Sequence, residues 1–414
     1  MTGESNNPVM LIPKIAFRNV FRNTRRSILT GLTIFAGFTL AAVSIGWTDG
    51  SYNYIIDLFT RNRLGHIQIH KGDYLDEPTL YKTIQEFKDV GRKLEEIEEL
   101  ESWAPRLYAS GLASVEDKST AIQINGIDPL REEKTTNFSK KITIGSTFSN
   151  KPSKETILGK GLAKVLKAEP GDTLVIVSQG ADGSIANDMY TIIGILESDN
   201  KMSDRMACYL HIQDAQQLLV LPDQCHEISI VVSSLDKVDE VTTDIRNKLD
   251  DPSLDVAPWQ EFARSFYRAM QADKKGNYIM HLIIMILVAV GVLNTVLMSV
   301  LERTREYGLM KALGTKPWQI IKLVILEINI IALVSVILGI GVSIVVNYIF
   351  SKHGISLPQS FTYGGMEFTT MYSEVSAKTI YIPAIIVFLT ASIAGIFPAL
   401  KAARTLPAKT MRIH

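Results

Sequence analysis

Few residues of this sequence could carry chemistry, and a pair of histidines is the first candidate. His66 and His70 lie four apart in the segment GHIQIH, a spacing that lets two histidines share a zinc ion when both stand on one face of a helix. The β-branched residues between them favour a strand, in which that spacing separates the side chains by roughly 13 Å. We therefore predict no metal site here.

Motifs of enzymatic catalysis and of nucleotide binding are also missing. The sequence has no GxSxG nucleophile elbow and no HExxH motif, the signatures of two large hydrolase classes. It also lacks the phosphate-binding loop GxxxxGK[ST], because ILGKGLAK and LGTKPW do not have the required glycine spacing. We predict that the chain is not an enzyme and has no cofactor of its own. Any ATP and Mg²⁺ would be bound by a partner ATPase.

Charge and hydropathy place the chain in a membrane. The 414 residues include 43 basic and 43 acidic ones, and this balance argues against nucleic acid as a partner. Crossing a bilayer takes about 20 apolar residues, and four segments meet this length: Ile28–Trp47, Ile279–Leu301, Gln319–Phe350 and Lys378–Leu400. We predict an integral membrane α-helical protein with four transmembrane helices.

The distribution of lysine and arginine predicts the orientation. These residues occur without acids just before the first span and after the fourth, and they recur between the second and third. Short basic loops stay in the cytoplasm. We therefore expect a protein of the cell inner membrane, with both termini and residues 301–327 on the cytoplasmic side and residues 48–277 on the outer side. The first span is too long for a secretory signal, and no cleavage site precedes Trp47. We expect it to be retained.

The external residues alternate between strand-like and helical patterns, which predicts a large α+β domain. Apolar residues at helical spacing follow the first span and precede the second. Two helices that meet through these stripes would form a stalk, although they could instead pack on the external domain. The predicted stalk residues are Tyr52, Ile55, Ile56, Phe59, Phe262, Phe266 and Met270.

The predicted domain organisation has six parts. Residues 1–27 form a cytoplasmic amphipathic helix at the membrane interface, because Phe17 and Phe21 lie opposite a row of basic residues. The remaining parts are 28–63 (transmembrane helix 1 and stalk), 64–261 (external α+β domain of two subdomains), 262–301 (stalk and transmembrane helix 2), 302–318 (cytoplasmic segment) and 319–414 (transmembrane helices 3 and 4 with a cytoplasmic C-terminus).

Four further residues have a functional and a structural interpretation. Cys208 and Cys225 both fall in the external part, where they could form a disulfide or remain two buried thiols. Glu327 lies within the third span, and we favour a structural pairing with a basic or polar neighbour over proton coupling. Asn294 in the second span is expected to join two helices rather than to bind substrate.

Three segments carry a family resemblance. They are IAFRNVFRNTRRSILT at the start, ERTREYGLMKALGTKPWQI between the second and third spans, and GIFPALKAARTLPAKTMR at the end. Together with a looser external match in TILGKGLAKVLKAEPGDTLVIV, the chain resembles the permease subunits of type VII ABC transporters, the FtsX- and MacB-like superfamily. It is most similar to the lipoprotein-releasing permeases of the LolC and LolE type. The resemblance implies a MacB-like periplasmic core domain and an FtsX-like permease domain over residues 275–410.

The resemblance also implies a role for residues 302–318. In this family the segment forms a coupling helix that docks on the ATPase subunit, whereas the plainer alternative is a cytosolic turn that only fixes topology. The residues that match the family's coupling segment by position are Arg303, Arg305, Glu306, Gly308, Lys311, Ala312, Leu313 and Gly314.

The implied partners are a dimer of ABC-type ATPase subunits and a second permease, in a homodimer or in a LolC/LolE-like heterodimer. The expected function is ATP-driven release of lipoproteins from the outer leaflet, with a lipoprotein, a periplasmic carrier and membrane lipid as further partners. The connection from Gln179 to Asn187 is short, so we do not expect it alone to recruit a periplasmic chaperone. The alternatives are MacB-like export of a peptide, drug or lipid and FtsX-like signalling to a cell-wall hydrolase.

Overall fold

The computed structural model describes residues 8–22, 24–198, 200–363 and 366–405. The chain forms two compact units. The membrane unit comprises residues up to 52, 271–356 and from 370 onward, and the external unit comprises 53–270 and 357–369. Each unit therefore combines segments that are distant in sequence.

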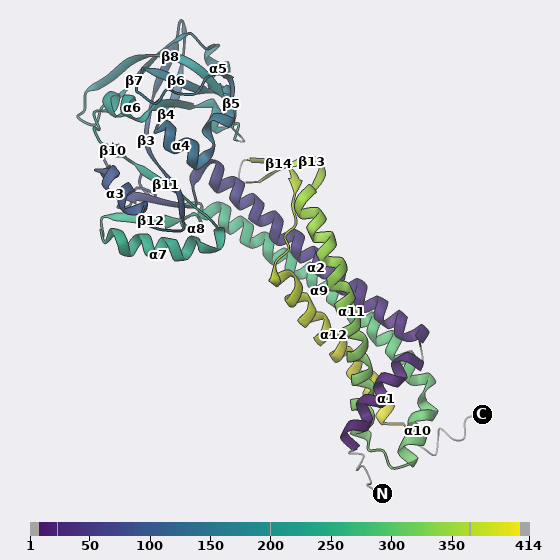
Figure 1. Ribbon diagram of the computed structural model, residues 1–414. Coiled ribbons are helices and arrows are strands. Elements are labelled where there is room, and N and C mark those ends of the chain that lie inside the picture. Colours follow the sequence, from purple (N-terminus) through teal and green to yellow (C-terminus); the bar gives the residue numbers. More distant parts are fainter. Residues whose placement is uncertain (1–7, 23, 199, 364–365, 406–414) are drawn as a thin grey trace. The chain divides into compact units, whose positions relative to one another are not determined.

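The membrane unit is a bundle of long helices (Figure 1). Among the residues that the structure describes, four helices are long and apolar enough to cross a membrane, and each contains one of the four predicted spans. Valine, isoleucine and alanine side chains from all four, together with Ala16 of α1, form one buried core. The helices are α1 (Pro8–Arg22), α2 (Thr24–Phe59), α9 (Arg264–Glu302), α10 (Thr304–Ala312), α11 (Pro317–His353) and α12 (Ala377–Ala403).

Gly46 and Gly50 are two of the glycines that allow α2 to pack closely. A Cβ atom on Gly46 would lie 2.6 Å from Nδ2 of Asn347, and one on Gly50 would lie 2.4 Å from the backbone of Ser373. The Asn347 side chain is fully used in this contact, because it donates to the Ala42 carbonyl at 3.3 Å and accepts from the Ser373 hydroxyl at 3.0 Å. A buried amide with both groups bonded stabilises one arrangement of the helices.

The external unit is built on one sheet in the order β12-β1-β11-β3-β4-β9-β6-β8-β5, with β7 pairing to β3 and β8 (Figure 1). The long strand β3 pairs with β11 through its first half and with β4 along the rest, so the two expected subdomains share a continuous sheet. The strands are β1 (Ile67–Lys71), β3 (Leu100–Val115), β4 (Lys118–Ile127), β5 (Ile142–Gly145), β6 (Glu155–Gly159), β7 (Thr173–Gln179), β8 (Ile185–Leu196), β9 (Ala207–His211), β11 (Glu227–Val232) and β12 (Leu254–Pro258).

Short helices and two small sheets complete this architecture. The small sheets pair β2 with β10 and β13 with β14. Their strands are β2 (Ile84–Gln85), β10 (Gln224–Cys225), β13 (Ile355–Tyr363) and β14 (Met366–Met371). The helices are α3 (Phe87–Leu94), α4 (Pro129–Thr136), α5 (Lys160–Leu166), α6 (Ile212–Leu219), α7 (Val238–Leu249) and α8 (Trp259–Phe262).

The disulfide considered for Cys208 and Cys225 is not formed. Both thiols are free and fully buried. They lie in separate sheets, because Cys208 belongs to β9 of the large sheet and Cys225 to β10 of a two-stranded one. Burial raises the pKa of the Cys208 thiol to about 12 and also raises that of Cys225. The plainer interpretation, two buried thiols, is the correct one.

Candidate functional site

The segment between the second and third membrane helices folds as a short helix with a defined start and end. Helix α9 stops at Glu302, α10 covers Thr304–Ala312, and the chain then turns at Gly314 with φ at +93°. Glycine adopts that conformation without steric cost. Pro317 starts α11, and the Gln319 side chain accepts a hydrogen bond from the backbone N–H of Lys316 at 2.8 Å. These sequence signals place α10 between two rigid helices.

A chain of charged contacts ties α10 to its neighbours. Glu327 of α11 accepts from Arg303 at 2.9 Å and from the Asn19 amide of α1 at 2.6 Å. Arg303 also donates to Glu306 at 2.9 Å, and Glu306 accepts from Arg22 at 2.5 Å. Glu327 thus has the basic partner that a carboxylate within a span requires. The contacts connect α1, α10 and α11.

The predicted coupling residues divide into internal and exposed groups. Arg303 and Gly308 are buried, and the Lys311 ammonium donates to the carbonyls of Ala403 and Thr405 at 2.9 Å each. These three residues therefore serve the chain's own packing. The exposed ones, which a partner could contact, are Arg305, Glu306, Ala312, Leu313 and Gly314.

Two exposed apolar residues were missed by the sequence analysis. Leu309 is 56% exposed and Trp318 is 55% exposed, beside Leu313 at 79%. Leu309 and Leu313 are four residues apart, and this spacing puts them on one face of a helical segment. That spacing between charged residues was a signal that could have identified Leu309. The segment therefore carries three exposed apolar side chains with charged neighbours in the sequence, and we call Leu309, Leu313 and Trp318 the α10 patch.

Glu306 is charged at neutral pH in this setting. Partial burial alone would raise its pKa, but the hydrogen bond and the positive charge of Arg303, aided by Arg22, outweigh burial and hold the pKa below its usual value. The carboxylate therefore remains able to pair with cations at its exposed side.

The stalk residues of the external unit are buried, with one exception, and two of them stack on each other. Phe59 and Phe266 stack with ring centroids 4.0 Å apart and planes 3° from parallel, and Ile55, Ile56 and Met270 are buried. Phe262 does not continue α9, because it ends the short helix α8 and a break at Ala263 follows. Its place in a continuous stalk helix was a wrong prediction. Tyr52 is buried within the membrane unit.

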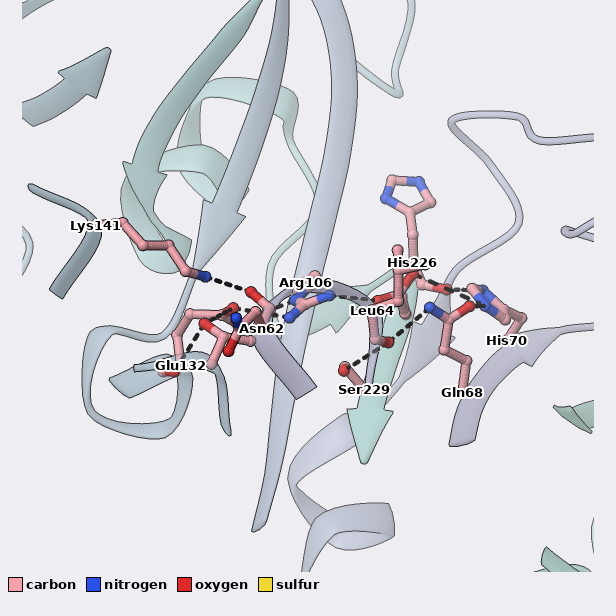
Figure 2. Close-up of polar contacts among 11 residues, drawn as sticks. Asn62, Leu64, Gln68, His70, Arg106, Glu132, Lys141, His226 and Ser229 are labelled. Carbon is pink, nitrogen blue, oxygen red and sulfur yellow. Dashed lines mark hydrogen bonds and ion pairs between the residues drawn. The ribbon is translucent and has the colours of Figure 1, made fainter. Parts of the chain in front are cut away.

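The end of the first stalk helix is bonded into the external sheet (Figure 2). After Phe59 the chain makes one π-helical turn, Thr60–Leu64. The Leu64 carbonyl accepts from Gln68 at 2.8 Å and from Ser229 at 3.0 Å, and the Asn62 carbonyl accepts from Lys141. A displacement of this turn would therefore act directly on β1 and β11.

Beside this turn, Arg106 of β3 lies between two acids. It donates to Glu132 of α4 at 2.8 Å and to Glu227 of β11 at 3.0 Å, and all three side chains are buried. Burial alone would raise the pKa of Glu132, but the charge of Arg106 outweighs it and lowers that pKa. The buried charges connect a helix with two strands.

The histidines at the start of the sheet make ordinary structural contacts. In β1, His70 contacts the His226 carbonyl and the Gln68 side chain at 3.1 Å each, as Figure 2 shows. The ring of His66, just before β1, accepts from the Val232 N–H at 3.1 Å. No cluster of three metal-ligating side chains occurs in the described part of the chain.

Asn294 does not make the helix contact expected of it. Its side chain is exposed on α9, so among the described residues of a single copy it joins no second helix. The 3.6-residue period explains this position, because Val292 and Val296 on either side of it take the buried face.

Comparisons with known proteins identify the family. The MacB-like periplasmic core domain matches residues 27–248, more than half of the chain, and the FtsX-like permease C-terminal domain matches residues 278–407. The lipoprotein-releasing system transmembrane protein LolC of Xylella fastidiosa is 23% identical over 75% of this chain and 77% of its own length. LolE of Haemophilus influenzae is 21% identical over 84% of this chain and 85% of its own length.

A larger protein and a solved structure also match. The macrolide export ATP-binding/permease protein MacB of Campylobacter jejuni is 24% identical over 83% of this chain but only 54% of its own length. The crystal structure of the periplasmic region of MacB from Actinobacillus actinomycetemcomitans matches 49% of this chain and 94% of its own, with 13% identity and a TM-score of 0.38. The chain therefore belongs to the multi-pass ABC transporter permeases of the LolC/LolE and MacB type, with a MacB-like periplasmic core domain and an FtsX-like permease domain.

Proposed function

We propose that this chain is the permease of an ATP-driven system that releases lipid-anchored proteins from the outer leaflet of the inner membrane. The observation that carries the coupling part of the proposal is the chain of contacts from Glu327 through Arg303 to Glu306. The substrate class is supported by the lipoprotein-releasing systems to which LolC and LolE belong, since these relatives match three quarters or more of the chain.

The ATPase is expected to dock on the α10 patch. Leu309 and Leu313 are exposed, while Arg303 and Lys311 fasten the same helix internally. A helix held in this way moves as one body with α1 and α11 instead of unwinding under load. Burial of two leucines and a tryptophan against the partner would provide affinity, and Glu306 and Arg305 would provide orientation.

The proposed path of motion follows two long helices. Helix α2 reaches Phe59 and α9 begins at Arg264, so each continues from a membrane span into the stalk. ATP, with Mg²⁺, would bind to two ATPase subunits on the cytoplasmic side, and two permeases would assemble with them. The external domains would then transmit the motion to the lipid-anchored protein or to a periplasmic carrier.

The docking proposal is tested by co-purifying the chain with a candidate ABC-type ATPase subunit from the same organism. The double variant Leu309→Asp/Leu313→Asp is expected to lower ATPase recovery at least tenfold, because both aspartates would replace apolar contacts. Leu130→Asp is the matched control, since Leu130 is 57% exposed but belongs to the external unit. Equal ATPase recovery with the double variant and with the control would reject docking at α10.

The substrate proposal requires a separate assay. The wild-type complex is placed in proteoliposomes that carry a fluorescent lipid-anchored protein, and its ATP-dependent transfer to the soluble fraction is measured with a periplasmic carrier present. Release above the level without ATP supports the proposal. Turnover of ATP without release would instead favour export of another substrate or signalling.

A further inference from the structure

A cavity of about 230 Å³ lies between α2, α9 and α12 of the membrane unit. Its wall changes character along its length. The apolar lining residues are Ala41, Ile45, Met285, Ile382, Pro383 and Ile386, and the polar ones include Asp49, Lys274 and His281. Pockets that take a whole drug-sized ligand begin at about 300 Å³, so this cavity suits one segment of a larger molecule.

The polar lining residues lie at one end of the cavity. Helices α2 and α9 run in opposite directions, so the change from apolar to polar residues occurs in opposite sequence order along them. Along α2 the lining changes from Ala41 to Asp49, and along α9 it changes in the reverse sense, from Lys274 to Met285. The eight residue steps from Ala41 to Asp49 span about 12 Å at 1.5 Å per step. The polar end is the one from which α2 continues toward the external unit. Under the expected orientation it lies at the level of the outer-leaflet headgroups, and the apolar end lies in hydrocarbon.

His281 leaves an unused polar atom in this cavity. Its Nδ1 is 2.6 Å from the Asn277 carbonyl oxygen, and because a carbonyl can only accept, Nδ1 carries the hydrogen. In the neutral ring the other nitrogen, Nε2, is an acceptor. This atom is buried and has no hydrogen-bond partner among the described residues. A buried acceptor without a donor is costly, and an N–H group of a bound molecule would satisfy it.

The charges of the cavity favour a ligand without a phosphate. Asp49 and Lys274 contribute one charge of each sign, and no arginine belongs to the lining. Phosphate sites usually combine arginine, lysine or several backbone N–H groups. An amide group, which offers a carbonyl oxygen to Lys274 and an N–H to His281, fits this balance better.

We propose that this cavity binds the acylated amino-terminal cysteine of a lipid-anchored protein, with one acyl chain along the apolar wall and the cysteine amide beside His281. The inference deepens the proposed function and rests on it for the identity of the ligand. The acyl chain would contact Ile45, Met285 and Ile386, while the amide N–H donates to Nε2 of His281.

The test uses the full-length chain with its ATPase in lipid nanodiscs. The probe is a synthetic diacylglyceryl-cysteine lipopeptide with a photoreactive group on one acyl chain, and crosslinked peptides are located by mass spectrometry. We expect labels on the α2, α9 and α12 residues that line the cavity. Ile45→Trp should lower labelling at least tenfold by filling the space. Leu282→Trp, on a 59% exposed position outside the lining, should leave labelling unchanged.

The His281 variants test the amide contact. Loss of one hydrogen bond in His281→Leu should lower labelling by about three- to tenfold, and His281→Gln, which keeps an acceptor, should restore most of it. Equal labelling of Ile45→Trp and Leu282→Trp would overturn the site. Equal labelling by a photoreactive phosphatidylethanolamine would also overturn it, because the cavity would then be a general lipid-filled gap.

The release assay separates this inference from the proposed function. Labelling with the expected variant pattern but no ATP-dependent release by the wild-type complex would refute lipoprotein release as the function and leave a lipopeptide site. Release that Ile45→Trp does not change, together with unchanged labelling, would refute the cavity site and leave the function standing. Folding of each variant is checked by its ATPase recovery and basal ATP turnover.

Discussion

Two arginines in this chain each lie between two glutamates, and the two clusters differ in how far the acids reach water. In the domain cluster, Arg106 contacts Glu132 and Glu227, whose side chains are 6% and 7% exposed. In the α10 cluster, Arg303 contacts Glu327, 13% exposed, and Glu306, 46% exposed. One cluster is closed on both sides, whereas the other has one open end.

This difference in exposure suggests that the domain cluster is fixed, whereas the α10 cluster can change its contacts when a partner binds. Charges that are buried on all sides cannot exchange partners with solvent, so the domain cluster holds α4, β3 and β11 in one arrangement. Glu306 can gain or lose a contact at the surface without exposing Arg303 or Glu327. An exposed carboxylate such as Glu306 suits a helix that binds a moving partner. A fully buried cluster suits a domain that moves as a rigid body.

The largest expected effect on stability comes from removing Arg106 of the domain cluster. Arg106→Met leaves two buried carboxylates without a counter-charge, and the loss of one partner from a buried ion pair costs about 3–5 kcal/mol. We expect the external unit to lose that much unfolding free energy in the full-length chain, measured by hydrogen exchange of β3 and β11. A loss below about 1 kcal/mol would show that the domain cluster is not the fixed cluster described above.

Removing Arg303 of the α10 cluster should lower stability less than removing Arg106 does, but should lower ATP turnover more. In Arg303→Met, Glu306 keeps its contact with Arg22 and Glu327 keeps the Asn19 contact, so we expect a loss of about 1–3 kcal/mol. ATP turnover of the assembled complex should fall about tenfold because α10 is no longer fastened to α11. Arg92→Met, at an exposed position of the external unit, is the control and should turn over ATP normally. Normal turnover in both variants would contradict the coupling role.

Low pH should lower the unfolding free energy of the external unit through the side chains of His70 and His226. Burial lowers the pKa of His70 and of His226, so below about pH 6.5 the unfolded chain binds protons that the folded one does not. Unfolding free energy should therefore fall as pH drops below 6.5, with a slope of up to about 1.4 kcal/mol per pH unit for each ring. His70→Gln/His226→Gln should flatten the slope between pH 6.5 and 5, whatever its stability at pH 7.5. An unchanged slope in the double variant would exclude these rings as the cause.

The smallest expected effect concerns the stalk. Phe266→Leu removes the ring stack with Phe59, and such a pair contributes about 0.5–1.5 kcal/mol beyond burial. We expect substrate release to fall two- to threefold while ATP turnover stays normal, since the ATPase contact is untouched. Phe262→Leu, at a half-buried ring in α8, is the matched control. Equal effects of the two changes would argue against the stack as a transmission element.

The sequence was most informative where the signal is local. Apolar length alone located the four spans, and the charged interruption after Leu301 located the α10 segment. The partners of Arg303 could not be predicted in the same way, because Glu327 is 24 residues distant, and Asn19, which also binds Glu327, lies 308 residues from it. Arg106 and Glu227, 121 residues apart, gave no sequence signal at all. Contacts between distant segments depend on the fold, and charge patterns do not specify them.

The two native thiols have a practical consequence. A cysteine reacts as its thiolate and needs access to solvent, whereas Cys208 and Cys225 are fully buried with raised pKa values. Maleimide dyes at neutral pH should therefore leave the folded native chain unmodified. A single cysteine placed at an exposed position, such as Leu130 or Leu313, then becomes the reactive site. Fluorescence measurements of motion during ATP turnover can thus begin from the natural sequence.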